Sequence, residues 1–338
     1  MQRQSALVTG VAGFVGSAIA RRLLSEGHSV IGVDCFLDYY PRALKEQNLA
    51  GLRERVIGNT GADNSAPGKS AFTFHELNLA HADLLPLFAG VDVVYHQAAQ
   101  AGVRKSWGGY FSTYLESNVL ATQRLLETIR VNKIALKKFV FASSSSVYGN
   151  AERLPTSELD RPQPVSPYGV TKLAAEHLCV LYANEFAVPT TSLRYFTVYG
   201  PGQRPDMAFY KFILAGLEGR DIELYGSGEQ SRDFTYIDDV VEANCLAAAK
   251  AESGSVFNIG GGSHVTVNQA LKIIEQYVGP LGVKKSERAA GDAAHTGADA
   301  SRAIEKLGFV PKVNIEIGLR NECDWLRAQL KSGAVARL

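Results

Sequence analysis

The sequence predicts an α/β protein built on a parallel sheet that helices cover on both faces. Three observations lead to this fold class. Short apolar runs alternate with longer helical patterns, glycines punctuate the first strand-to-helix connection, and small or hydroxyl residues follow the ends of later strands. Strand, helix and strand repeated in this order are typical of a doubly wound sheet.

The elements follow in order along the chain. Strands are expected at residues 5–9, 29–34, 71–77, 91–96, 138–143 and 190–194, with helices between them such as 14–26, 111–131 and 168–186. Residues 58–70 are polar and rich in glycine, which predicts a surface loop. After about residue 195 prolines, glycines and aromatics replace the strict alternation. We therefore expect a cofactor-binding unit at 1–195. Residues 196–338 should be a smaller, mainly substrate-binding region, with some segments returning to the first unit.

Composition excludes several classes of protein. The 338 residues carry 35 Lys+Arg and 34 Asp+Glu, a net charge of +1, so no nucleic-acid partner is expected. No run reaches the ~18 uncharged apolar residues of a membrane span, so no membrane partner is expected either. The 4 cysteines show no metal-ligand spacing, which predicts no metal site and reduced thiols in a cytoplasmic protein.

A glycine motif marks the expected cofactor site. Gly10, Gly13 and Gly16 follow the first strand and open the first helix, where backbone N–H groups and the helix dipole can hold a pyrophosphate. Asp34 ends the second strand. Its carboxylate can accept hydrogen bonds from a ribose 2′-hydroxyl and would repel a 2′-phosphate, so we expect NAD rather than NADP.

The remaining residues expected at this site are Phe14, Val15, Asn78, Leu79, Gln97, Ala98, Ala99 and Gln100. Among them Asn78 and Leu79 would hold the adenine, and the stretch after His96 would pass close to the dinucleotide. His96 itself is expected to be a packed core residue.

A tyrosine and a lysine form the expected catalytic pair. Tyr168 and Lys172 have the i, i+4 spacing that puts both on one helix face. A phenol with a pKa near ~10 is a poor base at neutral pH. A neighbouring ammonium and a positive nicotinamide ring would lower that pKa. Tyrosine can then take a hydroxyl proton while the cofactor takes the hydride. The serine run 143–146 ends the fifth strand and supplies hydroxyls for the reacting oxygen.

These motifs together resemble the extended short-chain dehydrogenase/reductase superfamily, in its nucleotide-sugar epimerase branch. Further carriers of the resemblance are the stretches 96–99, 147–149, 194–201 and 232–239. The resemblance covers nearly the whole chain. It implies a Rossmann-type domain that holds NAD, a C-terminal region that grips the UDP of a sugar nucleotide, and dimerisation through the helices at 111–131 and 168–186.

The resemblance also implies individual roles. Tyr168 matches the base, Lys172 its electrostatic and ribose-binding partner, and Ser144 the hydroxyl beside the C4 oxygen of the sugar. Arg232 matches the arginine that meets the diphosphate, Leu224 and Tyr225 the segment beside the uracil, and Asp292 a residue near the nucleotide. Asn78 departs from the usual aspartate, but its amide oxygen can still accept a hydrogen bond from adenine.

The substrate class follows from two further comparisons of residues. Related dehydratases and decarboxylases carry acidic residues where this chain has Ser145 and Ser146, and a neutral serine cannot remove the C5 proton. This favours epimerisation. The stretches 99–104 and 197–208, which include Arg104, Thr197, Met207 and Ala208, resemble UDP-glucuronate 4-epimerases.

The charge requirement of the sugar acid agrees with this reading. A carboxylate in a dry pocket needs hydroxyl and cationic donors, and Ser145, Ser146, Thr197 and Arg204 can supply them. The leading hypothesis is an NAD-dependent UDP-glucuronate 4-epimerase. A UDP-glucose or UDP-N-acetylglucosamine 4-epimerase is the alternative, and a non-catalytic NAD-binding protein is the third reading.

Overall fold

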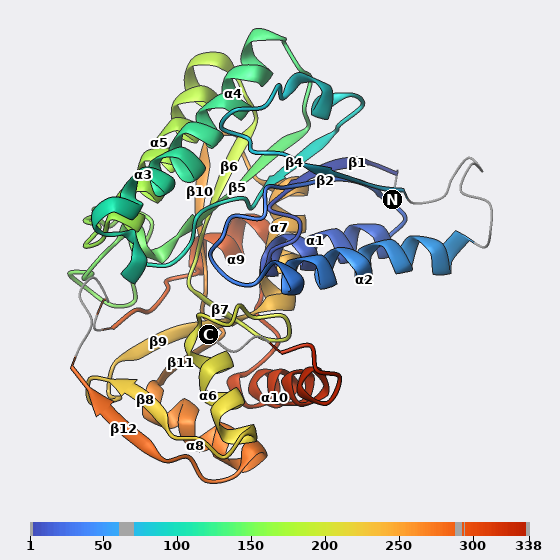
Figure 1. Ribbon diagram of the computed structural model, residues 1–338. Helices are drawn as coiled ribbons and strands as arrows, with labels where there is room; N and C mark the ends of the chain where they lie inside the picture. Colours follow the sequence, from blue (N-terminus) through green and yellow to red (C-terminus); the bar gives the residue numbers. More distant parts are fainter. Residues whose placement is uncertain (1–2, 61–70, 288–292, 294, 336–338) are drawn as a thin grey trace.

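The centre of the fold is a seven-stranded sheet in which every neighbouring pair is parallel. The computed structural model describes residues 3–60, 71–287, 293 and 295–335. The strands lie in the order β10-β6-β5-β4-β1-β2-β3 (Figure 1). The chain winds outward from the β1–β4 border in both directions, and such a border is where doubly wound sheets bind ligands. The bounds are β1 Ser5–Thr9, β2 Ser29–Asp34, β3 Phe72–Glu76, β4 Val93–His96, β5 Lys138–Ser144, β6 Thr190–Tyr195 and β10 Ser255–Ile259.

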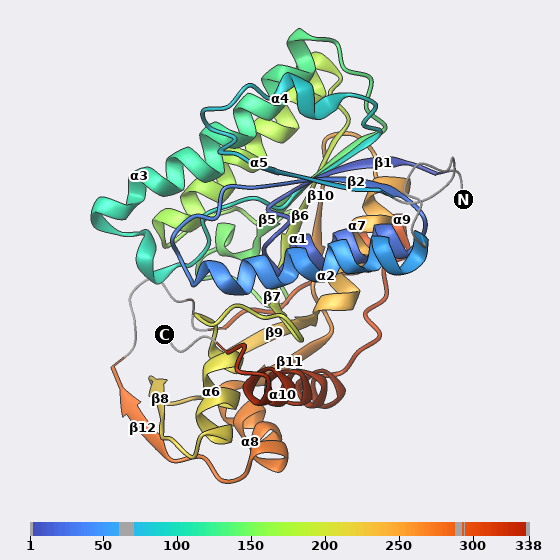
Figure 2. The ribbon, with the colours of Figure 1, turned by 45° about the vertical axis from the view of Figure 1, so that its right-hand side comes forward.

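Helices cover both faces of this sheet, as expected from the sequence (Figure 2). One face carries α3 Phe111–Tyr114, α4 Ala121–Val131 and α5 Pro167–Phe186, and the other carries α1 Phe14–Ser25, α2 Arg42–Thr60, α7 Ile237–Lys250 and α9 Ser301–Leu307. Leu7 and Val8 are adjacent on β1 and fully buried, but they belong to different apolar clusters on opposite faces. Burial on both faces explains why the strands read as continuous apolar runs.

The smaller lobe is built from the C-terminal part of the chain (Figure 1). It contains a three-stranded sheet in the order β11-β9-β7 and a two-stranded sheet of β12 and β8. The chain crosses back to the large sheet through α7, β10 and α9. The bounds are β7 Thr197–Tyr199, α6 Ala208–Leu217, β8 Ile222–Tyr225, β9 Ser231–Tyr236, β11 Ser263–Thr266, α8 Val267–Val278, β12 Val283–Ser286 and α10 Ile315–Lys331. Short 3-10 turns lie at η1 Leu85–Phe88, η2 Arg104–Ser106, η3 Gly108–Tyr110 and η5 Ser145–Val147.

The helix expected at residues 111–131 is interrupted by a π-helical segment, η4 Leu115–Leu120. Asn118 lies buried within it. Its side chain accepts a hydrogen bond from the Gln100 backbone N–H at 2.8 Å and donates to the Gln100 carbonyl at 3.1 Å and to the Thr171 hydroxyl at 3.0 Å. The wider turn therefore fixes the loop after β4 against α5. Such π segments are frequent at functional sites.

The loop expected at residues 58–70 begins later than predicted. Helix α2 continues to Thr60, so residues 58–60 are helical, and residues 61–70 lie outside the described part of the chain. The four cysteines are all free thiols. Within the described ranges, no helix has the length and apolar character needed to cross a membrane, and no group of three His, Cys, Asp or Glu side chains is arranged to hold a metal ion.

Candidate active site

One large cavity, of about 680 Å³, opens where the carboxyl ends of the parallel strands face the smaller lobe. Nearly all site residues predicted from the sequence line it. Asp292 is the exception, because it lies outside the described residues. The predicted residues that line the cavity are Gly10, Gly13, Phe14, Val15, Gly16, Asp34, Asn78, Leu79, Gln97, Ala98, Ala99, Gln100, Arg104, Ser144, Ser145, Ser146, Tyr168, Lys172, Thr197, Arg204, Met207, Ala208, Leu224, Tyr225 and Arg232.

The glycine turn between β1 and α1 fits a dinucleotide. Gly10 has a φ of +68°, and a Cβ there would lie 2.8 Å from the Ala98 Cα. A Cβ on Gly16 would lie 2.1 Å from the Gly10 carbonyl oxygen. Gly13 caps α1 without any side-chain hydrogen bond, so the first N–H groups of the helix remain available at the cavity wall. Close backbone approach and an open helix N-terminus are what a pyrophosphate requires.

Asp34 ends β2 beside this turn. Its carboxylate accepts hydrogen bonds from the Ala12 backbone N–H at 3.1 Å and the Phe36 backbone N–H at 2.9 Å. These bonds fix the direction of the carboxylate and leave acceptor capacity on both oxygens. Burial raises the pKa of Asp34, although the two N–H donors and the charge of Lys45 oppose that rise. Asp34 is thus oriented to accept from a ribose hydroxyl.

The far end of the cofactor region is lined by polar groups that already have protein partners. The Asn78 amide oxygen accepts from the Ala80 N–H at 2.9 Å, and its amide nitrogen donates to Glu116 at 3.2 Å. The Gln97 amide oxygen accepts from the Tyr195 hydroxyl at 3.1 Å. These contacts hold the loops after β3 and β4 in place. The Asn78 oxygen keeps one lone pair for an adenine amino group.

Tyr168 and Lys172 lie one turn apart near the start of α5. Ser166 caps this helix by accepting from the Gly169 N–H, and Pro167 occupies its first turn, a combination that fixes where the helix begins. Ser144, at the end of β5, is the hydroxyl partner of Tyr168. Lys172 is buried, and its ammonium donates to the Ala142 carbonyl at 2.8 Å. The structure therefore brings the three predicted catalytic side chains together.

Burial and two polar neighbours act in opposite directions on the pKa of the Tyr168 phenol. Burial raises the pKa of Tyr168, while the hydrogen bond with Ser144 and the charge of Arg204 lower it, and the net direction is upward. Burial lowers the pKa of Lys172 to about 8. Arg204 is thus a further cation near the phenol, in addition to Lys172 one turn along α5. Without a bound cofactor the net effect of burial keeps Tyr168 protonated at neutral pH.

His96 lies in the core, as expected from the sequence. Its ring is fully buried and sits between the hydroxyls of Thr9, at 2.7 Å, and Thr122, at 2.9 Å. Burial lowers the pKa of His96 to about 3, so the imidazole is neutral. It is a core residue that joins β1, β4 and α4.

The expected carboxylate-binding residues line the same cavity as Tyr168. Ser145 and Ser146 lie in the turn after β5, and Thr197 lies at the start of β7. Arg204 lies in the loop before α6 and is already in a two-point ion pair with Asp206, with Nε–Oδ1 and Nη2–Oδ2 distances of 2.9 Å each. The expected cation is therefore present, but its charge is balanced by an aspartate that the sequence analysis did not single out.

The remaining substrate candidates line the part of the cavity next to the smaller lobe. The Arg104 guanidinium stacks over the Tyr225 ring at 4.2 Å, and Leu224 is buried beside it on β8. Arg232 donates to the Ser231 carbonyl at 2.9 Å and the Ala293 carbonyl at 2.6 Å. Met207 and Ala208 form the N-terminus of α6, which faces the cavity. The Met207 side chain makes no capping hydrogen bond, but Gln203 Oε1 accepts from the Tyr210 N–H at 3.1 Å. A helix N-terminus and nearby arginines suit a diphosphate.

Several lining residues escaped the sequence analysis. They are Tyr39, Lys45, Asp206, Lys211 and Gln230. Lys45 is buried on α2 and donates to the Leu37 carbonyl at 2.5 Å. Asp206 alone carried a usable signal, because it lies two residues after Arg204 in the same motif. The others reach the cavity only through tertiary folding.

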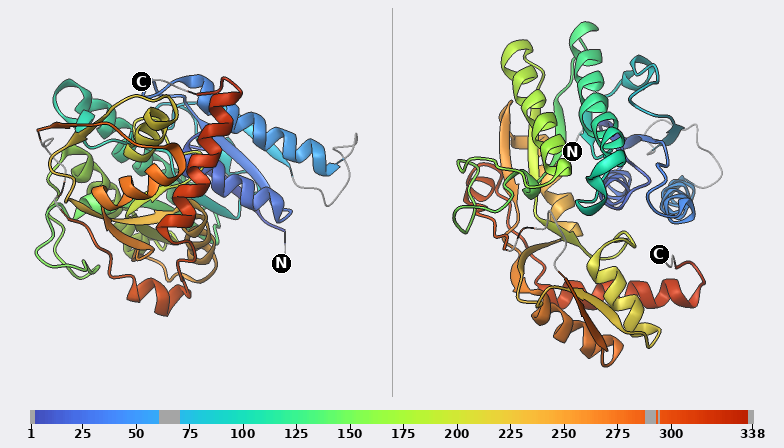
Figure 3. Two further views of the ribbon diagram at one scale, coloured as in Figure 1. Left: turned by 90° about the horizontal axis from the view of Figure 1, so that it is seen from below. Right: turned by 60° about the vertical axis from the view of Figure 1, so that its left-hand side comes forward.

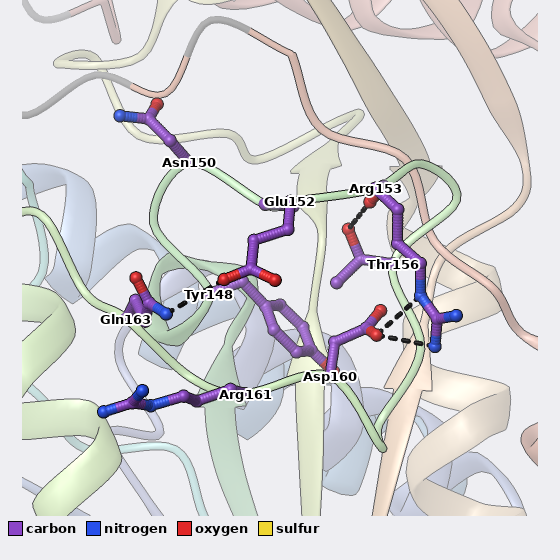
Figure 4. Close-up of a pocket in the computed structure, with 9 residues that line it drawn as sticks. Tyr148, Asn150, Glu152, Arg153, Thr156, Asp160, Arg161 and Gln163 are labelled. Carbon is purple, nitrogen blue, oxygen red and sulfur yellow. Dashed lines mark hydrogen bonds and ion pairs between the residues drawn. The ribbon is translucent and has the colours of Figure 1, made fainter.

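A second cavity, of about 330 Å³, lies in the loop that follows η5 and contains none of the predicted site residues (Figure 4). An ion pair between Arg153 and Asp160 and a hydrogen bond from Gln163 to Glu152 link side chains on its walls. The glycine turn and the Ser, Tyr and Lys set line the larger cavity instead, so the chemistry is assigned there.

A parallel sheet with a glycine turn at its switch point, and a Ser, Tyr and Lys set beside it, defines a dinucleotide-dependent α/β enzyme. The chain belongs to the NAD dependent epimerase/dehydratase family, and the model of this family matches residues 6–260. This confirms the resemblance found in the sequence and the expectation of NAD as cofactor.

Individual relatives agree with the family assignment. The chain is 43% identical over 95% of its length, and 97% of the other, to a protein of Bacillus subtilis (strain 168) named "Uncharacterized UDP-glucose epimerase YtcB". It is 37% identical to a "Probable UDP-glucuronate 4-epimerase" of Rhizobium meliloti (strain 1021), covering 94% of this chain and 96% of that protein. A UDP-glucuronic acid 4-epimerase from Bacillus cereus, solved with UDP-glucuronic acid and NAD, superposes with a TM-score of 0.87 at 39% identity, covering 96% of this chain and 99% of that one.

Proposed function

We propose that this protein is an NAD-dependent 4-epimerase that interconverts UDP-glucuronate and UDP-galacturonate. One observation carries the proposal: Ser145, Ser146, Thr197 and Arg204 line one cavity with Tyr168, beside a glycine turn that fits NAD. Hydroxyls and an arginine can hold a sugar carboxylate, and none of them is a base that could remove the C5 proton. The relative solved with UDP-glucuronic acid and NAD supports the same reading.

The residues divide the work of the reaction. NAD, when bound, takes the C4 hydride and returns it to the opposite face of the sugar. Tyr168 removes the proton of the C4 hydroxyl and gives it back, and Ser144 holds that oxygen. Lys172 stabilises the phenolate electrostatically and binds the nicotinamide ribose. The residues proposed to hold the cofactor are Gly10, Gly13, Phe14, Val15, Gly16, Asp34, Asn78, Leu79, Gln97, Ala98, Ala99, Gln100, Tyr168 and Lys172.

The carboxylate must be held for a chemical reason. Oxidation at C4 produces a ketone β to the carboxylate, and such an acid loses CO₂ when the bond to the carboxylate stands perpendicular to the carbonyl plane. An epimerase must prevent this alignment and still let the sugar ring turn its other face to the cofactor. We assign this restraint to Ser145, Ser146, Thr197 and Arg204.

The nucleotide end of the substrate is assigned to the smaller lobe. Arg104 stacked on Tyr225, with Leu224 beside them, forms a wall suited to the uracil ring. Arg232 and the N-terminus of α6 at Met207 and Ala208 suit the diphosphate. Asp292 remains a proposal from the family resemblance.

A neutral UDP-sugar is the second candidate, and a specific observation favours it. Asp206 already balances the charge of Arg204, so a neutral sugar leaves no unpaired cation in the cavity. The relative named as a UDP-glucose epimerase points the same way. The test compares kcat/KM for UDP-glucuronate and UDP-glucose in the wild type and in Thr197→Ala. Thr197→Ala removes a hydrogen bond to the charged carboxylate, so it should lower kcat/KM for UDP-glucuronate by roughly ten- to a hundredfold. The kcat/KM for UDP-glucose should not change. Faster turnover of UDP-glucose by the wild type contradicts the proposal.

We propose a homodimer in the cytoplasm. Large apolar side chains are exposed along η4 and α5, and the C-terminal part of α5 lies beside α4 on the outer face of the sheet (Figure 3). Leu115, Leu120, Leu181 and Phe186 are 43%, 42%, 51% and 50% exposed. Exposed apolar side chains on neighbouring helices suit contact with a second copy of the chain. The free thiols suit a reducing compartment. Light scattering that gives the mass of one chain contradicts the dimer.

A further inference from the structure

Tyr39, Asp206 and Arg204 form a chain of contacts across the mouth of the active-site cavity. Arg204 and Asp206 come from the loop between β7 and α6, and Tyr39 comes from the loop after β2. The Tyr39 hydroxyl donates to Asp206 Oδ2 at 3.3 Å, and the same carboxylate holds Arg204 through both of its oxygens. The three residues line the same cavity as Tyr168. The contact joins the cofactor-binding part of the chain to the loop that presents the arginine.

The geometry of the pair leaves the arginine able to bind a substrate. A guanidinium has five N–H donors, and Asp206 takes one from Nε and one from Nη2. The donors on Nη1 and the second donor on Nη2 remain for a ligand. Without its anchor the long Arg204 side chain would sample other rotamers and lose conformational entropy on binding. Because Asp206 binds the guanidinium at two points, it determines where the remaining N–H donors of Arg204 point.

Tyr39 is held in place by the loop after β4. A Cβ on Gly102 would lie 2.0 Å from the Tyr39 hydroxyl oxygen, and Gly102 has a φ of +98°, a conformation that glycine adopts without strain. The Lys105 ammonium lies 5.0 Å from the centre of the Tyr39 ring. The loop after β4 thus holds the phenol that holds Asp206, so the position of Arg204 is fixed from two sides of the cavity.

Electrostatics agree that the arginine sits at the reaction centre. The charge of Arg204 lowers the pKa of Tyr168, although burial of the phenol dominates. Burial alone would raise the pKa of Asp206, but the charge and hydrogen bonds of Arg204 hold it below its ordinary value. Asp206 is therefore an anion at neutral pH and stays paired with the Arg204 guanidinium.

We propose that Asp206, supported by Tyr39, is a positioning residue that sets the preference of this enzyme for an acidic over a neutral sugar. The proposal rests on the proposed function, in which Arg204 contacts the sugar carboxylate. Asp206 does not touch the substrate in this account. It aims the donors of Arg204 at the position that the carboxylate occupies, and it offsets the charge that would otherwise favour any anion in any orientation.

The test uses the NAD-loaded enzyme and the ratio of kcat/KM for UDP-glucuronate to that for UDP-glucose. Asp206→Asn should lower the value for UDP-glucuronate about tenfold, through KM, and leave that for UDP-glucose within about twofold. Tyr39→Phe should lower kcat/KM for UDP-glucuronate by about threefold, because it removes the hydrogen bond from the uncharged phenol to the Asp206 carboxylate. Asp324→Asn removes the aspartate of an exposed pair with Arg327 on α10 and should change neither value.

The outcomes separate this proposal from the proposed function. An unchanged ratio in Asp206→Asn, an equal fall for both substrates, or a stronger preference for the acid overturns the positioning role. A wild type that does not turn over UDP-glucuronate contradicts the proposed function instead. In that case the ratio of calorimetric Kd values for the two UDP-sugars, in the wild type and Asp206→Asn, gives the same comparison. A ratio that Asp206→Asn leaves unchanged then overturns the proposal too.

Discussion

Arg194 on β6 and Glu176 on α5 form a two-point ion pair in the interior of the protein. The Nε–Oε2 distance is 2.9 Å and the Nη2–Oε1 distance is 2.5 Å, and the side chains are only 5% and 2% exposed. The Ser143 hydroxyl donates to the same carboxylate at 2.6 Å, and Arg194 donates to the Tyr148 hydroxyl at 2.6 Å. The Glu176 carboxylate therefore ties the helix that carries Tyr168 to β6 and, through Ser143, to the end of β5 that carries the serine run.

Breaking this pair should cost far more than breaking an exposed one. Glu176→Gln leaves the Arg194 charge buried without a counter-ion, and we expect the free energy of unfolding to fall by about 3–5 kcal/mol. Urea unfolding measures the loss. The control is Glu46→Gln, which breaks an exposed pair with Arg42 on α2 and should have little effect. Equal decreases in the free energy of unfolding of the two variants would show that the buried pair stabilises the protein no more than the exposed one.

Tyr168→Phe should abolish turnover while NAD remains bound. The variant removes the proton-transferring hydroxyl but keeps a ring of the same shape, and acid–base groups contribute ~10²–10⁴-fold to rates. Steady-state kinetics measure the rate, and the absorbance of denatured protein measures retained cofactor. Turnover close to that of the wild type would remove Tyr168 from its role.

The cofactor released from the purified protein should be mainly NAD. Asp34→Ser should reduce the preference for NAD over NADP by roughly ten- to a hundredfold, because it removes both a charged acceptor for the ribose and the repulsion of a 2′-phosphate. Mass spectrometry identifies the released cofactor, and titration of the stripped protein gives the two Kd values. Mainly NADP in the wild type contradicts this role of Asp34.

A buried carboxyl on α10 should make stability depend on pH. Glu322 is fully buried, Oε2 accepts from the Gly200 N–H at 2.9 Å, and no described residue partners Oε1. Burial raises the pKa of Glu322 well above its usual value. The folded state thus keeps a proton that the unfolded state releases above about pH 4.3, so stability falls as pH rises from there.

Glu322→Gln should remove this part of the pH dependence. The amide can still accept from Gly200 but does not ionise. The variant should match the wild type most closely near pH 4 and gain on it as pH rises toward 8, measured by urea unfolding at each pH. A difference between the two proteins that stays constant across this range would show that Glu322 titrates normally.

Sequence reasoning located most of the candidate site because of a topological rule. The carboxyl ends of parallel strands meet at one edge, so Gly10, Asp34 and Ser144 could be placed together once their strands were recognised. The helical spacing of Tyr168 and Lys172 added the catalytic pair. These predictions need only local patterns and the order of elements.

Long-range contacts set the limit of that reasoning. Tyr39 meets Asp206 across 167 positions of the chain, and no local pattern announces such a contact. The same holds for the partner of Lys172, whose ammonium donates to the Ala142 carbonyl 30 positions earlier in the chain. The π-helical segment around Asn118 was also missed, because apolar periodicity looks the same through one wide turn.

Product analysis of a single reaction distinguishes C4 epimerisation of the sugar acid from its alternatives. UDP-glucuronate is incubated with the NAD-loaded wild type, and proton NMR follows the sugar ring. We expect inversion at C4 alone, which gives UDP-galacturonate, with the carboxylate retained and a rate above that of UDP-glucose conversion in a parallel sample. No inversion with NAD still bound, decarboxylation to a pentose as the main reaction, or faster conversion of UDP-glucose would contradict it.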